Sequence, residues 1–321
     1  MIGYKISSTQ EIYVQVLSTG RSGTQMLASL LQYLGLNAHH ESLTIANASP
    51  QVLYGKINDL GDLWSKDKDQ YYRFTTDFFD HYITNLSTEF QNNLQTKVLW
   101  KNVKASLRNI PDYQGALMLK SKKHVIDCNN VRVPAVPVIQ NKLSQNGIKV
   151  KTVVLVRNPF KTIHALYKVE GKSNFEYRPK SFLDPDLVTS AANVWKETYN
   201  LIYDQIMHAG GNYYLLILEK FSNDQTFVKP FFDFIELQYS ERLYKSFMKF
   251  LDKQPYRTQK VTTIRNSDLF HDPEFSFNES QLDQIQLIIQ NTASLYKLDL
   301  DNYREEYVKF HRELDKRIFN N

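Results

Sequence analysis

The chain has 321 residues, of which 42% are hydrophobic and 23% are charged, a balance that predicts a globular protein with a substantial core. The formal net charge of +5 is a mild basic excess spread along the chain, and it suits a small anionic ligand at least as well as a nucleic acid. Because the sequence has no basic tail, zinc-finger spacing or aromatic ribonucleoprotein motif, we expect no nucleic-acid partner.

Cysteine usage and hydropathy bear on the compartment. Cys128 is the single cysteine, so no internal disulfide can form, which fits a reducing compartment. The N-terminal stretch lacks the charged start and long apolar core of a signal peptide, and no run approaches the ~18 apolar residues of a membrane span. We therefore expect a cytoplasmic protein with no membrane partner.

The first expected element is a buried strand from Ile12 to Ser18, which is rich in β-branched residues and ends before Gly20. Apolar residues then recur at helical spacing from Met26 to Leu34, and Gly35 ends that helix. A strand, a glycine turn and a helix in this order are typical of the opening of a doubly wound α/β unit.

The same pattern returns near the middle of the chain. The stretch "KTVVLVRNP", residues 151–159, predicts an apolar strand of the parallel-sheet type, and Pro159 suits the first turn of the helix that follows. A third strand is expected at 213–218, with shorter candidates at 98–100 and 124–126. Helices are expected at 186–208, 226–236, 240–252, 280–297 and 302–319.

Neither repeats nor a linker rich in proline, glycine or serine divide the chain, so we expect one domain over residues 1–321. Its expected architecture is a P-loop-like three-layer α/β fold, with a central parallel sheet flanked by helices and a helical C-terminal part. Residues 42–95 and 168–185 are polar, aromatic and irregular, and are interpreted as insertions or lids over a site.

The turn after the first strand, "STGRSGT" at residues 18–24, has the features of an anion site. Free backbone N–H groups at a helix N-terminus and the helix dipole attract an anion, and phosphate is the usual occupant. The two glycines let the backbone approach such a ligand, and Ser22 and Thr24 add hydroxyl groups. Thr24 follows the second glycine directly and Arg21 is the only cation of the turn, which argues against a Walker A loop and its magnesium–nucleoside triphosphate.

Two stretches resemble landmarks of the sulfotransferases that use 3′-phosphoadenosine-5′-phosphosulfate (PAPS). "STGRSGTQML" resembles the loop that binds the donor's 5′-phosphosulfate, which reads Arg-Ser-Gly-Thr in many bacterial, carbohydrate and tyrosylprotein members. "VVLVRNPFKTIHALY" is similar to the strand that ends in Arg-(Asp/Asn)-Pro and binds the 3′-phosphate. The resemblance covers roughly residues 12–41 and 150–168.

The resemblance implies transfer of a sulfuryl group from PAPS to a hydroxyl, or in second place an amine, by in-line displacement. The product of the donor is 3′,5′-adenosine bisphosphate, and no metal is expected. Arg21 would neutralise the charge on the departing phosphate, and Arg157 would pair with the 3′-phosphate. The 5′-phosphate would be held by Gly20, Arg21, Ser22, Gly23, Thr24 and Gln25.

One position departs from the family pattern. Many members carry a serine eight residues after the arginine that binds the 3′-phosphate, where this chain has Ala165. Either another side chain replaces that serine or the affinity for the donor is reduced. The candidates for the replacement are Thr162, Lys161, Arg257 and Arg265.

A general base must take the acceptor's proton as the nucleophile attacks sulfur. In "NAHHESL", residues 37–43, Glu41 matches the glutamate that serves as base in tyrosylprotein and many bacterial relatives, and His40 would orient it. The rival base is His124, because cytosolic relatives carry a Lys-x-His on a middle strand and Lys122 precedes His124 at that spacing. The alternative interpretation of His39, His40 and Glu41 is a solvated loop.

The partner is expected to be a small-molecule acceptor. The aromatic content of the two irregular stretches favours a small organic alcohol or natural product over an anionic polysaccharide. Trp195 and Tyr199, on the long helix, are interpreted as core residues in preference to adenine contacts. Two other functions stay open: a catalytically silent nucleotide-binding member of the fold, for which Ala165 argues, and a small-molecule kinase with a degenerate loop.

Overall fold

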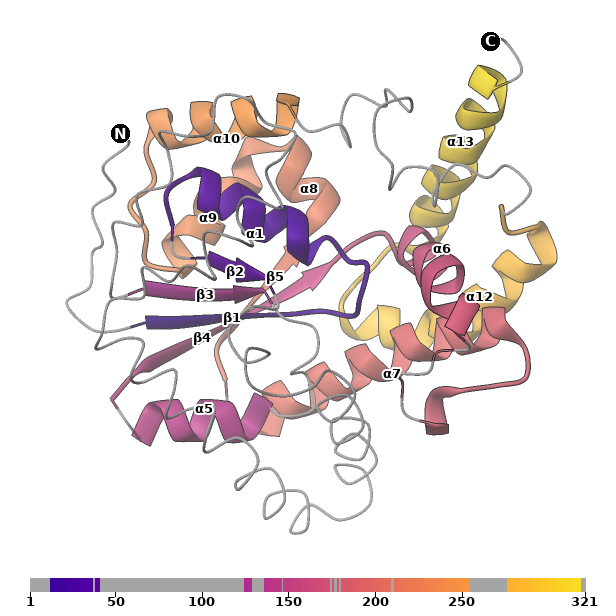
Figure 1. Cartoon of the computed structure of the whole chain (residues 1–321), viewed down its shortest axis with the longest axis horizontal. Helices are drawn as coiled ribbons and strands as arrows, with labels where there is room; N and C mark the ends of the chain where they lie inside the picture. The colour runs from indigo at the N-terminus through magenta and orange to yellow at the C-terminus, as the bar shows by residue number, and fades with distance from the viewer. Residues whose placement is uncertain are drawn as a thin grey trace.

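In a computed structural model of the chain, the described residues are 12–36, 38–40, 124–128, 136–145, 147–173, 175, 178, 180–208, 211–253 and 276–318. They contain a five-stranded sheet in the order β2-β3-β1-β4-β5, with every pairing parallel (Figure 1). The strands are β1 Ile12–Leu17, β2 Ala38–His40, β3 His124–Cys128, β4 Lys149–Val156 and β5 Tyr213–Ile217. Because all strands are parallel, their carboxyl ends meet at one edge of the sheet.

The central strands of the sheet consist largely of buried residues. All six residues of β1 are buried, as are the last five of β4, which is typical of parallel strands covered on both faces. The strands predicted to begin near residues 12, 151 and 213 are confirmed, and the short candidate at 124–126 is part of β3. The sequence pattern does not reveal β2, because Ala-His-His has no apolar run. The candidate at 98–100 lies outside the described residues.

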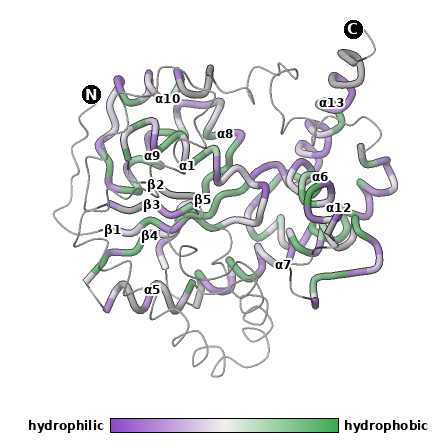
Figure 2. Tube along the Cα trace, viewed as in Figure 1, coloured by the Kyte–Doolittle hydropathy of each residue, from purple (hydrophilic) through white to green (hydrophobic). Residues whose placement is uncertain are grey.

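Helices cover both faces of the sheet, which confirms the three-layer α/β architecture (Figure 1). They are α1 Thr24–Tyr33, α5 Val136–Gln145, α6 Pro159–Glu170, α7 Leu187–His208, α8 Leu218–Asn223, α9 Gln225–Phe234, α10 Glu241–Lys253, α12 Glu279–Leu295 and α13 Leu300–Ile318. One hydrophobic core joins the sheet to α1, α9 and α10, and the other joins it to α6, α7, α12 and α13 (Figure 2). The β1–α1 unit with its glycine turn is P-loop-like in form.

Helix ends follow local capping signals. Pro159 begins α6, and Asn158 before it accepts a hydrogen bond from the N–H of Lys161 at 3.2 Å. Asp224 caps α9 by accepting from the N–H of Thr226 at 2.8 Å. The five helices predicted in the second half of the chain are confirmed, each to within two residues at either end.

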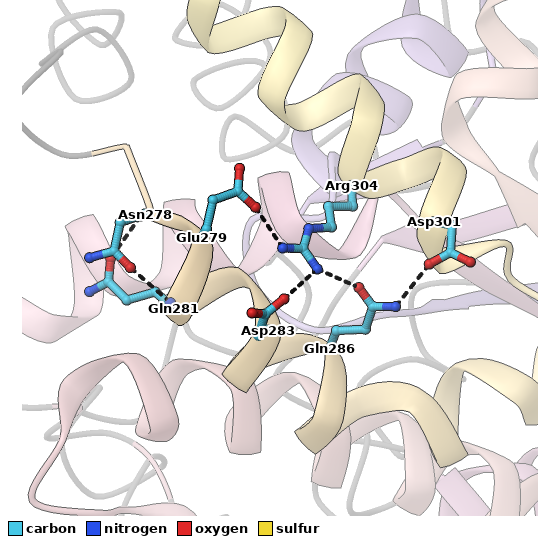
Figure 3. Close-up of polar contacts among 7 residues, drawn as sticks. All are labelled: Asn278, Glu279, Gln281, Asp283, Gln286, Asp301 and Arg304. Atoms are coloured by element: carbon cyan, nitrogen blue, oxygen red, sulfur yellow. Dashed lines mark hydrogen bonds and ion pairs between the residues drawn. The ribbon is translucent and has the colours of Figure 1, made fainter.

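The last two helices are joined by polar side chains of their facing turns (Figure 3). Arg304 of α13 pairs with Glu279 and Asp283 of α12, each at 2.7 Å. Arg304 also donates to Gln286 at 3.2 Å, and Gln286 donates to Asp301 at 2.9 Å. These contacts hold α13 against α12, which matters because α13 also supports the candidate site.

The two irregular stretches are only partly described. Residues 42–95 lie outside the described residues, so their interpretation as a lid stays a prediction. In the second stretch the chain forms two 3-10 turns, η2 Gly171–Ser173 and η3 Lys180–Phe182. None of the helices in the described ranges is both long enough and apolar enough to cross a membrane.

Candidate functional site

The glycine turn lies at the carboxyl edge of the sheet, between β1 and α1. Its backbone enters the left-handed region twice, with φ of 67° at Arg21 and 95° at Gly23, and α1 begins directly afterwards. Arg21 is exposed, whereas Ser18, Thr19 and Ser22 are fully buried. The turn therefore offers an anion its backbone N–H groups and one guanidinium.

Unpaired polar atoms lie within this turn. Ser18 Oγ and Thr19 Oγ1 are buried and have no hydrogen-bond partner among the described residues, an arrangement that costs free energy unless another group satisfies them. Thr24, at the start of α1, is also buried, and Gln25 beside it is exposed. The set of hydroxyl and N–H donors fits an anion.

Gly23 is a position at which a side chain would strain the backbone and displace a neighbouring side chain. Its φ of 95° is one that L-residues rarely adopt. A Cβ atom there would lie 2.6 Å from Cδ2 of Leu218, the first residue of α8. The junction between β5 and α8 is thus packed directly against the turn.

The second predicted landmark lies beside the first. β4 neighbours β1, and Arg157 follows the last residue of β4. Arg157 Nη1 donates to the backbone oxygen of Arg21, 136 positions earlier, at 3.1 Å. The two arginines on which the sequence prediction depends are therefore neighbours in space.

Asn158 holds the Arg157 turn from several directions. Its backbone N–H donates to Glu219 Oε1 of α8 at 2.9 Å. Its side-chain Nδ2 donates to the backbone oxygen of Tyr303 at 2.9 Å and to Glu306 Oε2 at 3.3 Å, both on α13. Its Oδ1 caps α6, so one amide side chain ties the turn to its own helix and to α13.

Lys161, on the first turn of α6, is a second cation at this place. Burial lowers the pKa of its ammonium group, and Arg157 lowers it further. The carboxylates of Glu219 and Glu306 shift that pKa in the opposite direction. The positive charge beside Arg157 is therefore partly balanced by two acidic side chains.

The position of the missing serine is a buried one. Ala165 lies within α6 and is 2% exposed. Thr162 is fully buried, and its Oγ1 has no hydrogen-bond partner among the described residues. Arg257 and Arg265 lie outside the described residues. Within the part of the chain that the structure describes, Lys161 is the charged candidate for replacing the serine.

His124 lies at the opposite end of the sheet from the glycine turn. It begins β3 and pairs with Ile12, the first residue of β1. The turn begins after Leu17. At roughly 3.3 Å per residue, Leu17 is about 17 Å further along β1 than Ile12. This placement corrects the expectation that His124 acts as a base at the turn.

His124 has a structural role instead. Its Nε2 lies 2.7 Å from the backbone oxygen of Ile235, at the C-terminus of α9, and Lys151 donates to the backbone oxygen of Phe234 beside it. Burial lowers the pKa of His124. The imidazole and the ammonium group thus satisfy the last carbonyls of α9.

Glu41 lies outside the described residues, but the strand before it is described. His40, the last residue of β2, pairs with Cys128 of β3, and Cys128 pairs with Val16 of β1. His40 is therefore level with the end of β1 at the carboxyl edge, and Glu41 is the next residue in the chain. The prediction that Glu41 is the base stays a prediction.

Three contributors to the site are not evident from the sequence: Leu218, Glu219 and Tyr199. Trp195 and Tyr199 are fully buried, which confirms their interpretation as core residues, but the Tyr199 hydroxyl also lies 3.4 Å from Ser22 Oγ in the turn. For Glu219 the available signal is its place directly after a predicted strand. No local pattern distinguishes Leu218 or Tyr199 from ordinary core residues.

Metal and thiol chemistry have no evident centre in the described ranges. No group of three or more His, Cys, Asp or Glu side chains there is arranged to hold a metal ion. Cys128 is buried, and burial raises the pKa of its thiol, which keeps it inert. That the reaction needs no metal stays a prediction.

No protein-family model matches the chain, and neither does any curated protein. Solved structures that resemble it include sulfotransferase domains from the Synechococcus PCC 7002 olefin synthase and the curacin biosynthetic pathway, and a sulfotransferase from Mycobacterium avium. Their identities to this chain are 14%, 13% and 10%, and their TM-scores are 0.42, 0.44 and 0.46. The matches cover 93%, 92% and 92% of this chain and 100%, 100% and 79% of theirs. Likeness at this level assigns no role to any residue of this chain.

The contact between Gly23 and Leu218 gives a stability prediction. We expect Gly23→Ala to lower the free energy of unfolding by about 3 kcal/mol, the sum of left-handed strain and overpacking. Gly147→Ala is the matched control, because Gly147 has a φ of 75° but open space around its Cβ position, so it should cost about 1 kcal/mol. Urea unfolding measures both. Adding Leu218→Ala to Gly23→Ala should recover part of the loss, and equal losses in the two glycine variants would show that the contact does not matter.

The buried imidazole gives a prediction about pH. The pKa of His124 is lowered from its ordinary value of 6.5 in the folded protein, so below pH 6.5 the unfolded chain binds the proton more readily and stability falls. His124→Gln keeps a donor for the oxygen of Ile235 but does not titrate. We expect the free energy of unfolding of the variant to fall less than that of the wild type between pH 7 and pH 5. Parallel curves for the two proteins would contradict the assignment.

Proposed function

We propose that this chain transfers the sulfuryl group of PAPS to a hydroxyl of a small organic acceptor, with an amine in second place. The observation that carries the proposal is the hydrogen bond from Arg157 Nη1 to the backbone oxygen of Arg21 at 3.1 Å. It joins the two stretches whose sequences resemble the 5′- and 3′-phosphate landmarks of PAPS-dependent sulfotransferases. A chance match to one short motif gives no reason for the two stretches to meet.

The turn provides the groups that the donor's 5′-phosphate needs. A phosphate accepts hydrogen bonds from backbone N–H groups at a helix N-terminus and is favoured there by the helix dipole. The unpaired hydroxyls of Ser18 and Thr19 lie in the same turn, and the left-handed backbone at Gly23 leads directly into the N-terminus of α1. We assign the 5′-phosphate to residues 20–25 on this basis.

The 3′-phosphate would pair with Arg157, with Lys161 in place of the missing serine. A guanidinium and an ammonium group are both strong donors to phosphate. Glu219 and Glu306 oppose part of this charge. We therefore expect the 3′-phosphate to contribute less to binding than the 5′-phosphate does.

The chemistry follows from charge development. Arg21 would stabilise the negative charge that grows on the bridging oxygen as its bond to sulfur breaks, and the N–H groups of α1 would hold the leaving phosphate. Glu41 would take the acceptor's proton as the acceptor oxygen bonds to sulfur. The products are the sulfated acceptor and 3′,5′-adenosine bisphosphate, and no covalent enzyme intermediate forms.

The donor site is tested by calorimetric titration. Wild-type protein should bind 3′,5′-adenosine bisphosphate without a metal and in preference to ATP with magnesium. Arg157→Met should lower the affinity for the bisphosphate by about tenfold to a hundredfold, because it removes a charge-assisted hydrogen bond. The affinity for adenosine 5′-monophosphate should stay nearly unchanged. Arg242→Met, an exposed arginine on α10, is the control. A preference for ATP with magnesium would favour the kinase, and bisphosphate binding without turnover would favour the silent binding protein.

The base is tested by kinetics once an acceptor supports turnover. Glu41→Gln should lower kcat by about a hundredfold or more, remove the acidic limb of the pH profile, and leave the affinity for 3′,5′-adenosine bisphosphate unchanged. Glu305→Gln, an exposed carboxylate on α13, is the matched control. Turnover at the wild-type rate in Glu41→Gln would show that another group takes the proton.

A further inference from the structure

A buried tyrosine beside the glycine turn, Tyr199, has no part in the proposed chemistry. Tyr199 comes from the middle of α7 and is fully buried. Its ring lies 4.7 Å from that of Trp195 and 5.5 Å from that of Tyr296, measured between centroids. Tyr296 in turn donates to the backbone oxygen of Tyr199 at 2.7 Å. The ring is therefore held on several sides, and its hydroxyl has a defined position.

That hydroxyl links β4 to the glycine turn just past the end of the pairing between β1 and β4. The ladder between the two strands ends at the pair Leu17–Val154. Tyr199 Oη donates to the backbone oxygen of Leu155, the next residue of β4, at 2.7 Å. The same oxygen lies 3.4 Å from the hydroxyl of Ser22, in the turn that follows β1. One buried hydroxyl thus connects β4 to the turn at the point where the chain has left the sheet.

The donor and acceptor roles have a consequence for Ser22. Burial raises the pKa of Tyr199, so the hydroxyl stays neutral and its one proton goes to the oxygen of Leu155. In the contact of 3.4 Å between Tyr199 Oη and Ser22 Oγ, the serine is then the donor. The Ser22 hydroxyl is directed at Tyr199, and the backbone N–H of Ser22 is the group that remains for a ligand.

We propose that Tyr199 is a positioning residue of the glycine turn. Its hydroxyl holds Ser22 against the end of β4, so that the N–H groups of the turn and of α1 converge on one anion. The inference deepens the proposed function and rests on it for the identity of that anion, the 5′-phosphate of PAPS. The geometry of the turn is inferred independently of the proposed function.

The test compares Tyr199→Phe with Tyr203→Phe. Tyr203 lies one turn further along α7 and its ring also packs against Tyr296, at 5.8 Å between centroids, so the control removes a hydroxyl from the same helix. In Tyr199→Phe the affinity for adenosine 5′-monophosphate should fall about fivefold to thirtyfold, as expected for one lost hydrogen bond with buried partners. The affinity for adenosine 3′-monophosphate should stay within about twofold of the wild type, since the backbone that carries Arg157 is held through Asn158 by Glu219 and α13.

Amide hydrogen exchange tests the geometry without a ligand. In Tyr199→Phe, exchange of the amides of residues 18–22 should accelerate relative to Tyr203→Phe. Ser22→Ala removes the same contact from the other side and should accelerate those amides as well. Unchanged exchange in Ser22→Ala would overturn the inference even if Tyr199→Phe failed to fold. Unchanged exchange in Tyr199→Phe, or an equal loss of affinity for both monophosphates, would also overturn it. A wild type that bound neither nucleotide, with the exchange result as expected, would refute the proposed donor and leave the positioning role standing.

Discussion

The hydrogen bond from the Arg157 side chain to the Arg21 backbone depends on one property of the sheet, which is that β1 and β4 are parallel neighbours ending at the same edge. Each strand feeds a helix that begins at this edge, α1 after the glycine turn and α6 after Asn158. Two helix N-termini therefore lie at the same edge, and the Arg157 guanidinium lies against the backbone of Arg21. An antiparallel pairing would have put them at opposite ends of the sheet.

The site is held by parts of the chain that carry none of the expected chemistry. The β5–α8 junction touches both landmarks, because Leu218 packs on Gly23 and Glu219 accepts from the N–H of Asn158. The helix α13 reaches Asn158 from the C-terminal end of the chain, through the backbone of Tyr303, and the Arg304 contacts hold α13 on α12. The position of Arg157 thus depends on residues 60 to 150 places further along.

Prediction from sequence succeeded where burial leaves an unbroken pattern. Strands covered on both faces, such as β1 and most of β4, are apolar throughout. The edge strand β5 is also a short apolar run, and the long helix α7 repeats with its own period, so all four elements are visible in the sequence. It failed for β2 and for the position of His124. A three-residue strand has no period to read, and a Lys-x-His spacing does not say which end of a strand it occupies.

The sequence alone determined the longer strands and helices, the glycine turn and the two arginine landmarks, because backbone conformation and strand-to-helix transitions depend on neighbouring residues. Only the tertiary structure decided that the landmarks meet, that the charges of Arg157, Glu219 and Glu306 all act on Lys161, and that His124 caps α9 at the far edge. It also decided that one tyrosine hydroxyl links β4 to the turn. These contacts join residues tens to more than a hundred positions apart, and the order of strands in the sheet, which no local pattern encodes, sets which of them become neighbours.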